Sequence, residues 1–168
     1  MRAGLDSLNQ RNRNYETLSI AEVQPYVDFF TRYGTANDRV LAHYLLGRAY
    51  HDGGEAPKAL EQYQKAAECA DTSSADCDYH TMTAIYGQIA DLFHLEFLPN
   101  DELRALQQVE QYAKLDKDTF SSIMAYKTAT GKIRDRSAHT NMFQYSRRTA
   151  KGKTRKTRNY PKTTRRYK

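Results

Sequence analysis

The stretch VLAHYLLGRAYHDGGEAPKALEQYQKAAECAD, residues Val40 to Asp71, decides the fold prediction for this chain. Both of its halves carry small and large side chains on one helical face, at spacings of four residues or fewer. These residues are Leu46, Gly47 and Tyr50 in the first half, and Ala59, Tyr63 and Ala66 in the second. Small residues that face large aromatic ones allow two antiparallel helices to approach closely. The segment therefore predicts a pair of packed helices.

The sequence also predicts a break between the two helices. Gly53 and Gly54 follow the first periodic run, and glycine tolerates the positive φ that a tight helix exit requires. Pro57 comes shortly afterwards, in the first turn of the next helix, where its missing N–H has no intrahelical partner to lose. The sequence thus predicts a helix, a short glycine turn and a second helix.

This pattern resembles the tetratricopeptide repeat (TPR), whose Leu-Gly pair, following Tyr, and later Ala, aromatic and Ala are matched at all six positions. His43 stands where the family has Trp, and Asp71 stands where it has a closing Pro. The resemblance, which is to bacterial proteins of this type, implies an all-α fold. Its antiparallel helix pairs would stack as a right-handed α-solenoid.

A second, more divergent unit follows, and a third begins. Ile89, Ala90 and Phe93 echo the first unit at an offset of 43 residues, whereas a strict member of the family repeats every 34. Ala105 then takes the part of Ala59 at an offset of 46. The expected array covers residues 37–132, with units at about 37–73, 74–116 and a partial third at 117–132.

Segments of different character flank the array. Residues 1–36 are expected to form helices that pack on it, one of them opened by a capping box at Ser19 and Glu22. Within the array, Asn37 or Asp38 is expected to cap the first helix, and Asn100 or Asp101 is expected to cap the second helix of the second unit. Residues 133–168 are a basic, low-complexity tail. Within it, 137–168 have no helical period and few apolar residues, so we expect disorder there.

The charge distribution separates the body from the tail. Residues 132–168 hold 14 Lys and Arg and one acidic residue, whereas residues 1–131 hold 12 basic and 19 acidic residues. The overall charge of +6 is therefore the sum of a body at −7 and a tail segment at +13. A basic tail on an acidic body indicates a separate role for the tail.

The resemblance implies a groove lined by the first helix of each unit, which would bind a segment of a partner protein. Helical spacing places a set of polar side chains on the exposed side of these helices. The candidate groove residues are Tyr44, Arg48 and His51 in the first unit, and Asp91 and His94 in the second. The same offset also places Gly87 on this face of the second unit. The alternative is that they are ordinary solvated positions. The predicted function is a protein–protein interaction module, acting as a scaffold or adaptor.

Catalysis is not indicated. The sequence has no His-Glu-x-x-His or paired Cys-x-x-Cys for zinc, and no nucleophile elbow, phosphate loop or dinucleotide fingerprint. A small metal site formed by His51, Asp91 and His94 is the remaining alternative. Cys69 and Cys77 are eight residues apart, and we expect free thiols rather than a disulfide. We therefore expect neither an enzyme, nor a cofactor, nor a metal.

The tail supports an alternative function. Dense cationic charge interleaved with tyrosines suits nucleic acid or another polyanion, because cations release counterions from phosphates and tyrosines stack on bases. The candidate polyanion-binding residues are Arg147, Arg148, Lys151, Lys153, Arg155, Lys156, Arg158, Arg165 and Arg166. Three other readings stay open: docking of the tail on the acidic body, an inert solvated terminus, and a shifted reading frame that replaces the rest of a longer array.

Two further expectations concern assembly and location. If the helix from Asp118 to Lys132 ends the array, its outer side exposes Ile123, Met124 or Tyr126, which predicts weak self-association or fraying of the helix. The sequence has no run of 18 apolar residues and no apolar leader core, so we expect a cytoplasmic protein without a transmembrane segment. A cell-envelope location is the alternative if a leader has been removed.

Overall fold

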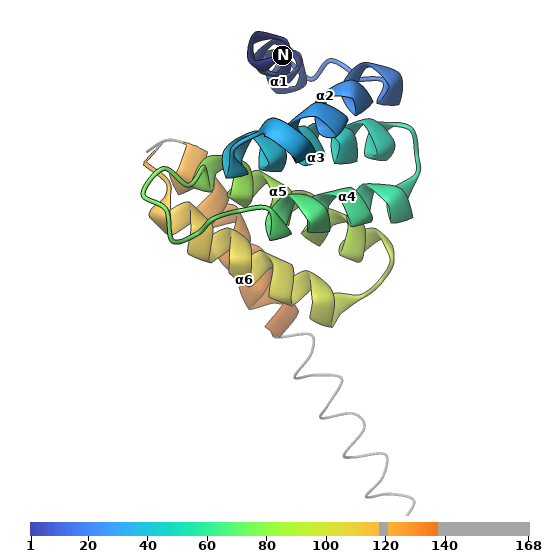
Figure 1. Ribbon diagram of the computed structural model, residues 1–168. Helices are drawn as coiled ribbons and strands as arrows, with labels where there is room; N and C mark the ends of the chain where they lie inside the picture. Colours follow the sequence, from blue (N-terminus) through green and yellow to red (C-terminus); the bar gives the residue numbers. More distant parts are fainter. Residues whose placement is uncertain (118–120, 138–168) are drawn as a thin grey trace, which may run out of the picture. The chain divides into compact units, whose positions relative to one another are not determined.

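The computed structural model describes residues 1–117 and 121–137, which fold as helices joined by turns, with no strand among them (Figure 1). The all-α prediction is thereby confirmed. The helices are α1 (Arg2–Arg13), α2 (Ile20–Tyr33), α3 (Ala36–Asp52), α4 (Ala56–Glu68), α5 (Tyr79–Leu95) and α6 (Pro99–Leu115). A further helix covers residues 121–137 and is called here the terminal helix. Residues 1–133 form one compact unit, and residues 134–168 belong to a second.

Side-chain caps set the beginnings of α2 and α3. Ser19 and Glu22 form the predicted capping box of α2, in which each side chain binds the other residue's backbone N–H. Thr35 and Asp38 form a second capping box at α3, whereas the sequence indicated Asn37 or Asp38 as the cap. Asn37 is engaged elsewhere, because its amide donates to the Asp76 carbonyl oxygen at 2.7 Å. Thr35, two residues before Asn37, is therefore the N-cap, and Asp38 completes the box from the third helical position.

The turn between α3 and α4 follows the sequence prediction. Gly54 has a φ of 77°, in the left-handed region that glycine enters without steric cost. Pro57 lies in the first turn of α4, as predicted. The glycine pair thus ends α3 sharply enough for α4 to fold back against it, and the two helices pack together.

Tyr63 fills the seam between α3 and α4. Its side chain is fully buried, as are Ala59 and Ala66 on the same face of α4. An added Cβ on Gly47 would lie only 2.5 Å from Cε1 of Tyr63, so the ring occupies the space that a side chain on Gly47 would need. Burial also raises the pKa of the Tyr63 hydroxyl well above its usual value, which keeps the group neutral.

The seam between α5 and α6 is built differently. Tyr86 of α5 stacks on Tyr112 of α6, with ring centroids 5.5 Å apart. Asp78 caps α5 by accepting from the Thr81 backbone N–H, whereas α6 has no side-chain cap. The sequence indicated Asn100 or Asp101 as the cap of α6, but the helix begins earlier, at Pro99. In this seam the stack of Tyr86 on Tyr112 takes the place of the contact between Gly47 and Tyr63 in the first seam.

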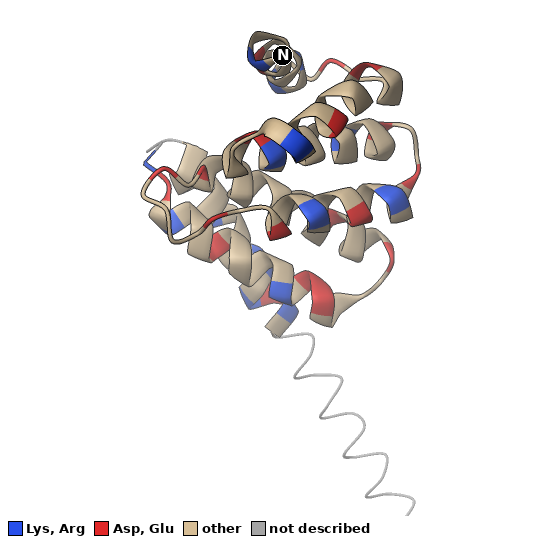
Figure 2. Cartoon of the chain, viewed as in Figure 1, with Lys and Arg blue, Asp and Glu red and all other residues tan. Residues whose placement is uncertain are grey.

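Successive helices pack along the chain in residues 1–133: α2 on α3, α3 on α4, α4 on α5, and α5 on α6, while α1 also touches α3 (Figure 1). Acidic and basic residues are interspersed over α1 to α6 (Figure 2). Among the described residues, no helix has the length and apolar character needed to cross a membrane.

Candidate functional site

The candidate site is a pocket between α5, α6 and the terminal helix, with a volume of about 360 Å³. Its floor is apolar, because Leu106 and Val109 of α6 lie beneath it and are almost fully buried. Met124 of the terminal helix lines it and is 51% exposed, so the pocket can be reached from solvent. A mostly apolar hollow of this size with few polar groups is typical of a binding site.

Gly87 gives the pocket part of its depth. An added Cβ on Gly87 would find no heavy atom outside its local helix within 4 Å. Ala84, one turn earlier on the same face of α5, also lines the pocket, and its small side chain fills little of the space. Two small residues on α5 therefore leave the space open on this side.

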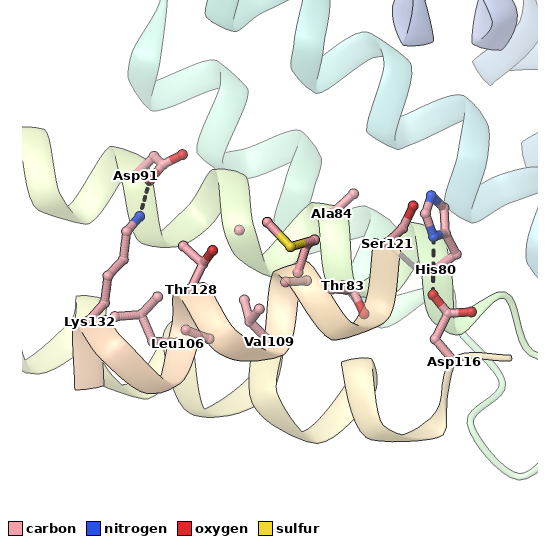
Figure 3. Close-up of a pocket in the computed structure, with 14 residues that line it drawn as sticks. His80, Thr83, Ala84, Asp91, Leu106, Val109, Asp116, Ser121, Thr128 and Lys132 are labelled. Atoms are coloured by element: carbon pink, nitrogen blue, oxygen red, sulfur yellow. Dashed lines mark hydrogen bonds and ion pairs between the residues drawn. The ribbon is translucent and has the colours of Figure 1, made fainter. Parts of the chain in front are cut away.

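An ion pair or hydrogen bond closes each end of the pocket (Figure 3). At one end the His80 ring nitrogen Nδ1 lies 3.1 Å from the Asp116 carboxylate. At the other end the Lys132 ammonium lies 3.2 Å from the Asp91 carboxylate. His80 and Asp91 are eleven residues apart on α5, which corresponds to about 16 Å along the helix axis. The site is thus an elongated apolar trough with polar groups at both ends.

The three candidate groove residues on α3 do not line an open groove, because each is buried or already in contact with another residue. The structure corrects the expectation for Tyr44, because this side chain is only 9% exposed and packs near the Tyr63 ring. Arg48 is bonded on several sides, donating to Asp52 at 3.1 Å and to Gln88 of α5 at 2.8 Å.

Arg48 also meets the N-terminal part of the chain, donating to Asn12 of α1 at 3.3 Å. His51 lies against the Tyr63 hydroxyl, 3.5 Å from its Nδ1 atom. Helix α1 thus reaches the side of α3 that the sequence assigned to a groove.

The two candidate groove residues on α5 make different contacts. Asp91 lines the pocket and pairs with Lys132. His94 lies one turn later and interacts instead with Glu102 of α6, at 3.3 Å. The five candidates therefore do not gather in one place. The alternative of a metal site at His51, Asp91 and His94 has no support, because residues 1–117 and 121–137 contain no cluster of three metal-binding side chains.

The sequence reasoning missed the part of the terminal helix that walls the pocket. Ser121, Ala125, Thr128 and Lys132 line it, at the three- and four-residue spacings of one helical face. This spacing is visible in the sequence and marks a face. It does not reveal that the face lies opposite α5.

The remaining predicted site residues, from Arg147 to Arg166, lie outside the described residues. Cys69 and Cys77 are unpaired thiols. The predicted exposure at the terminal helix is confirmed for Ile123 and Met124, which are 46% and 51% exposed. Tyr126 is only partly exposed.

Comparison of the chain with protein-family models, with curated proteins and with solved structures finds no significant match. The site must therefore be interpreted from its own chemistry.

Proposed function

We propose that the chain is a protein-interaction module that binds a segment of a partner protein in the trough between α5 and the terminal helix. One observation carries the proposal: the solvent-accessible pocket of about 360 Å³ with an apolar floor and a polar group at each end. Apolar side chains of a bound segment would occupy the floor, and its backbone or polar side chains would meet the two ends.

The burial of a single leucine side chain sets the scale of such binding. Fully removing one from water contributes about 1.5–3 kcal/mol, which is roughly tenfold to a hundredfold in affinity. A trough about 16 Å long can contact several residues of an extended segment, each spanning about 3.3 Å. Binding of this kind would not require a cofactor or a reacting group.

The proposal includes a TPR-like arrangement, with α3–α4 and α5–α6 as consecutive units of an α-solenoid and the terminal helix as the start of a third. Two inter-helix contacts support it. Arg48 meets Gln88, and Asp91 meets Lys132, so side chains on successive first helices touch at sequence separations of 40 and 41. The close contact of Gly47 with Tyr63 also agrees with the small-to-aromatic pattern of that family.

A peptide-display selection tests this function. Peptides that bind the wild-type protein should lose affinity by about tenfold or more for Gly87→Leu, because the new side chain would extend into the trough from a position where an added Cβ meets no heavy atom outside its local helix within 4 Å. Gln64→Leu, on the exposed side of α4, is the matched control and should bind normally. Amide chemical-shift changes on binding should concentrate on the trough residues. Peptides that bind both variants equally, with shifts elsewhere, would refute the proposal.

A second function is favoured by the basic charge of the tail. We propose that the nine candidate Lys and Arg residues of the tail bind nucleic acid or another polyanion, mainly through phosphate contacts. Affinity for a single-stranded oligonucleotide should then fall steeply with added salt. Replacing the nine candidate residues with Gln in the full chain should abolish it, whereas Gly87→Leu should leave it unchanged. Salt-independent binding that survives the nine replacements would exclude this function.

A further inference from the structure

A second hollow lies on a neighbouring face of the terminal helix, where this helix meets the end of α6. We call it the end pocket. It has a volume of about 410 Å³ and is lined by Ala113 and Lys114 of α6, by Lys117 just after that helix, and by Ile123 and Tyr126 of the terminal helix, among others. The trough contacts Ser121, Met124 and Thr128 instead, so the two sites use different faces of the helix.

The apolar part of the end pocket is only partly covered. Ile123 is 46% exposed, although it lines the hollow. The ring of Tyr126 forms another part of the wall, and the Lys114 ammonium lies 5.4 Å from the centre of that ring. A bulky apolar side chain entering the hollow would remove Ile123 from water, which is favourable by about 25 cal/mol per Å² of apolar surface.

The end pocket has lysines around it, whereas residues 1–131 as a whole carry a net negative charge. Lys117 lines the hollow, and Lys127 lies one turn beyond Ile123 on the same helix. Neither lysine has an acidic partner among residues 1–117 and 121–137. The acid at the hollow, Asp116, is 8% exposed at its side chain and is bonded to His80. Lys114, which also lines the hollow, is paired with Glu110 at 2.9 Å. Among the described residues, the accessible unpaired charge at the hollow is therefore positive.

We propose that the end pocket docks an acidic amphipathic helix of a partner protein. One apolar side chain of that helix fills the hollow beside Ile123, and carboxylates one turn away face Lys117 and Lys127. Helical spacing of three and four residues supplies both groups from one face of the ligand. This surface lies on another face of the terminal helix than the trough and shares only Asp116 with it, so the inference goes beyond the proposed function and does not depend on it.

Charge and shape select this occupant over two others. A symmetric pair of two copies would bring the same patch against itself, and would place Lys117 and Lys127 near their own counterparts. A nucleic acid would satisfy the lysines, but it would leave the aliphatic side chain of Ile123 without an apolar contact. An acidic helix with an apolar stripe satisfies both features.

The test uses a synthetic helical peptide of about 18 residues, with leucines along one face and glutamates beside them. Two control peptides replace the glutamates with lysines or the leucines with serines. We expect the acidic leucine peptide to bind the full chain, with an affinity that falls as salt is added. Both control peptides should bind about tenfold more weakly or worse.

Variants of the protein then locate the peptide. Ile123→Ser and the double change Lys117→Glu with Lys127→Glu should each weaken binding by about tenfold or more. Lys58→Glu with Lys65→Glu on α4 makes the same change in charge elsewhere and should have little effect. Circular dichroism checks that every variant remains helical.

Three outcomes would overturn the proposal. The first is binding of the acidic peptide that Ile123→Ser leaves unchanged. The second is a concentration-dependent dimer in analytical ultracentrifugation that disappears in Ile123→Ser, which would assign the pocket to a second copy. The third is a single-stranded oligonucleotide that displaces the peptide and is itself lost with the two end-pocket lysines. Gly87→Leu should not affect the peptide, which separates this site from the trough.

Discussion

The helix pairs α3–α4 and α5–α6 each contain a glycine on the first helix, but the two glycines have opposite surroundings. On α3, the space beside Gly47 is filled by the Tyr63 ring, with 2.5 Å between its Cε1 atom and an added Cβ. On α5, the space beside Gly87 is open. The same residue type therefore brings two helices together in one pair and leaves an open pocket in the other.

The difference arises from what covers each first helix. Helix α3 contacts α1, α2, α4 and α5, so its faces are occupied. Helix α5 is covered by α3, α4 and α6, while Gly87 faces the trough between α5 and the terminal helix. A glycine on the first helix of a pair thus allows close packing in α3–α4 and borders an open pocket in α5–α6.

The largest expected effect comes from removing the aromatic side chain of the first seam. Tyr63→Ala should lower the free energy of unfolding by about 3–5 kcal/mol, because it leaves a large buried cavity. Tyr112→Ala in the second seam should cost less, since Tyr112 is 9% exposed whereas Tyr63 is fully buried. Urea unfolding followed by circular dichroism measures both. Equal losses in the two variants would contradict the comparison.

The next effect concerns Gly47. Gly47→Ala should cost about 1–3 kcal/mol in packing and lower the free energy of unfolding by up to about 2 kcal/mol net, because the methyl group would overlap the Tyr63 ring and force the helices apart. The gain in helix propensity, about 1 kcal/mol, offsets only part of this cost. Thermal unfolding detects the change. A variant as stable as the wild type would show that the seam can adjust around the ring.

A change of opposite sign is expected at Gly87. Gly87→Ala should raise the free energy of unfolding by up to about 1 kcal/mol, because alanine favours the helix and meets no neighbour within 4 Å. The same thermal unfolding assay serves for both glycines, so each variant is the control for the other. Destabilisation by Gly87→Ala would mean that the trough is less open than described.

The smallest expected change in stability lies outside the two helix pairs, in the capping box of α2. Hydrogen bonds from the Ser19 backbone and hydroxyl, followed by one from Arg11, lower the pKa of Glu22 to about 2. A carboxyl group with a lowered pKa contributes stability above its ordinary value of 4.5, and that contribution is lost as the pH falls toward 2.

Glu22→Gln should therefore melt at a slightly lower temperature than the wild type at pH 7. The difference should shrink as the pH is lowered from about 4.5 to about 2. Melting curves over this pH range provide the measurement. A difference that is constant with pH would show that the charge of Glu22 does not contribute.

Much of the fold was predictable because its signals are local. The capping box at Ser19 and the exit at Gly54 depend on residues a few positions apart, and their backbone requirements leave few alternatives. The shift of the α3 cap to Thr35 is a local error of the same small scale. The contact of Gly47 with Tyr63 also follows from the spacing of small and aromatic residues, once the two helices are joined by a short turn.

By itself, the amino-acid sequence determined the helical class of the described residues, the turn at the glycine pair and the faces on which small and aromatic residues gather. Only the tertiary structure decided which of those faces stays open. Arg48 is engaged by α1, 36 residues away, and Asp91 meets Lys132, 41 residues away. The physical reason is that helical periodicity orients a side chain about its own axis, whereas its exposure depends on which distant helix packs against that face.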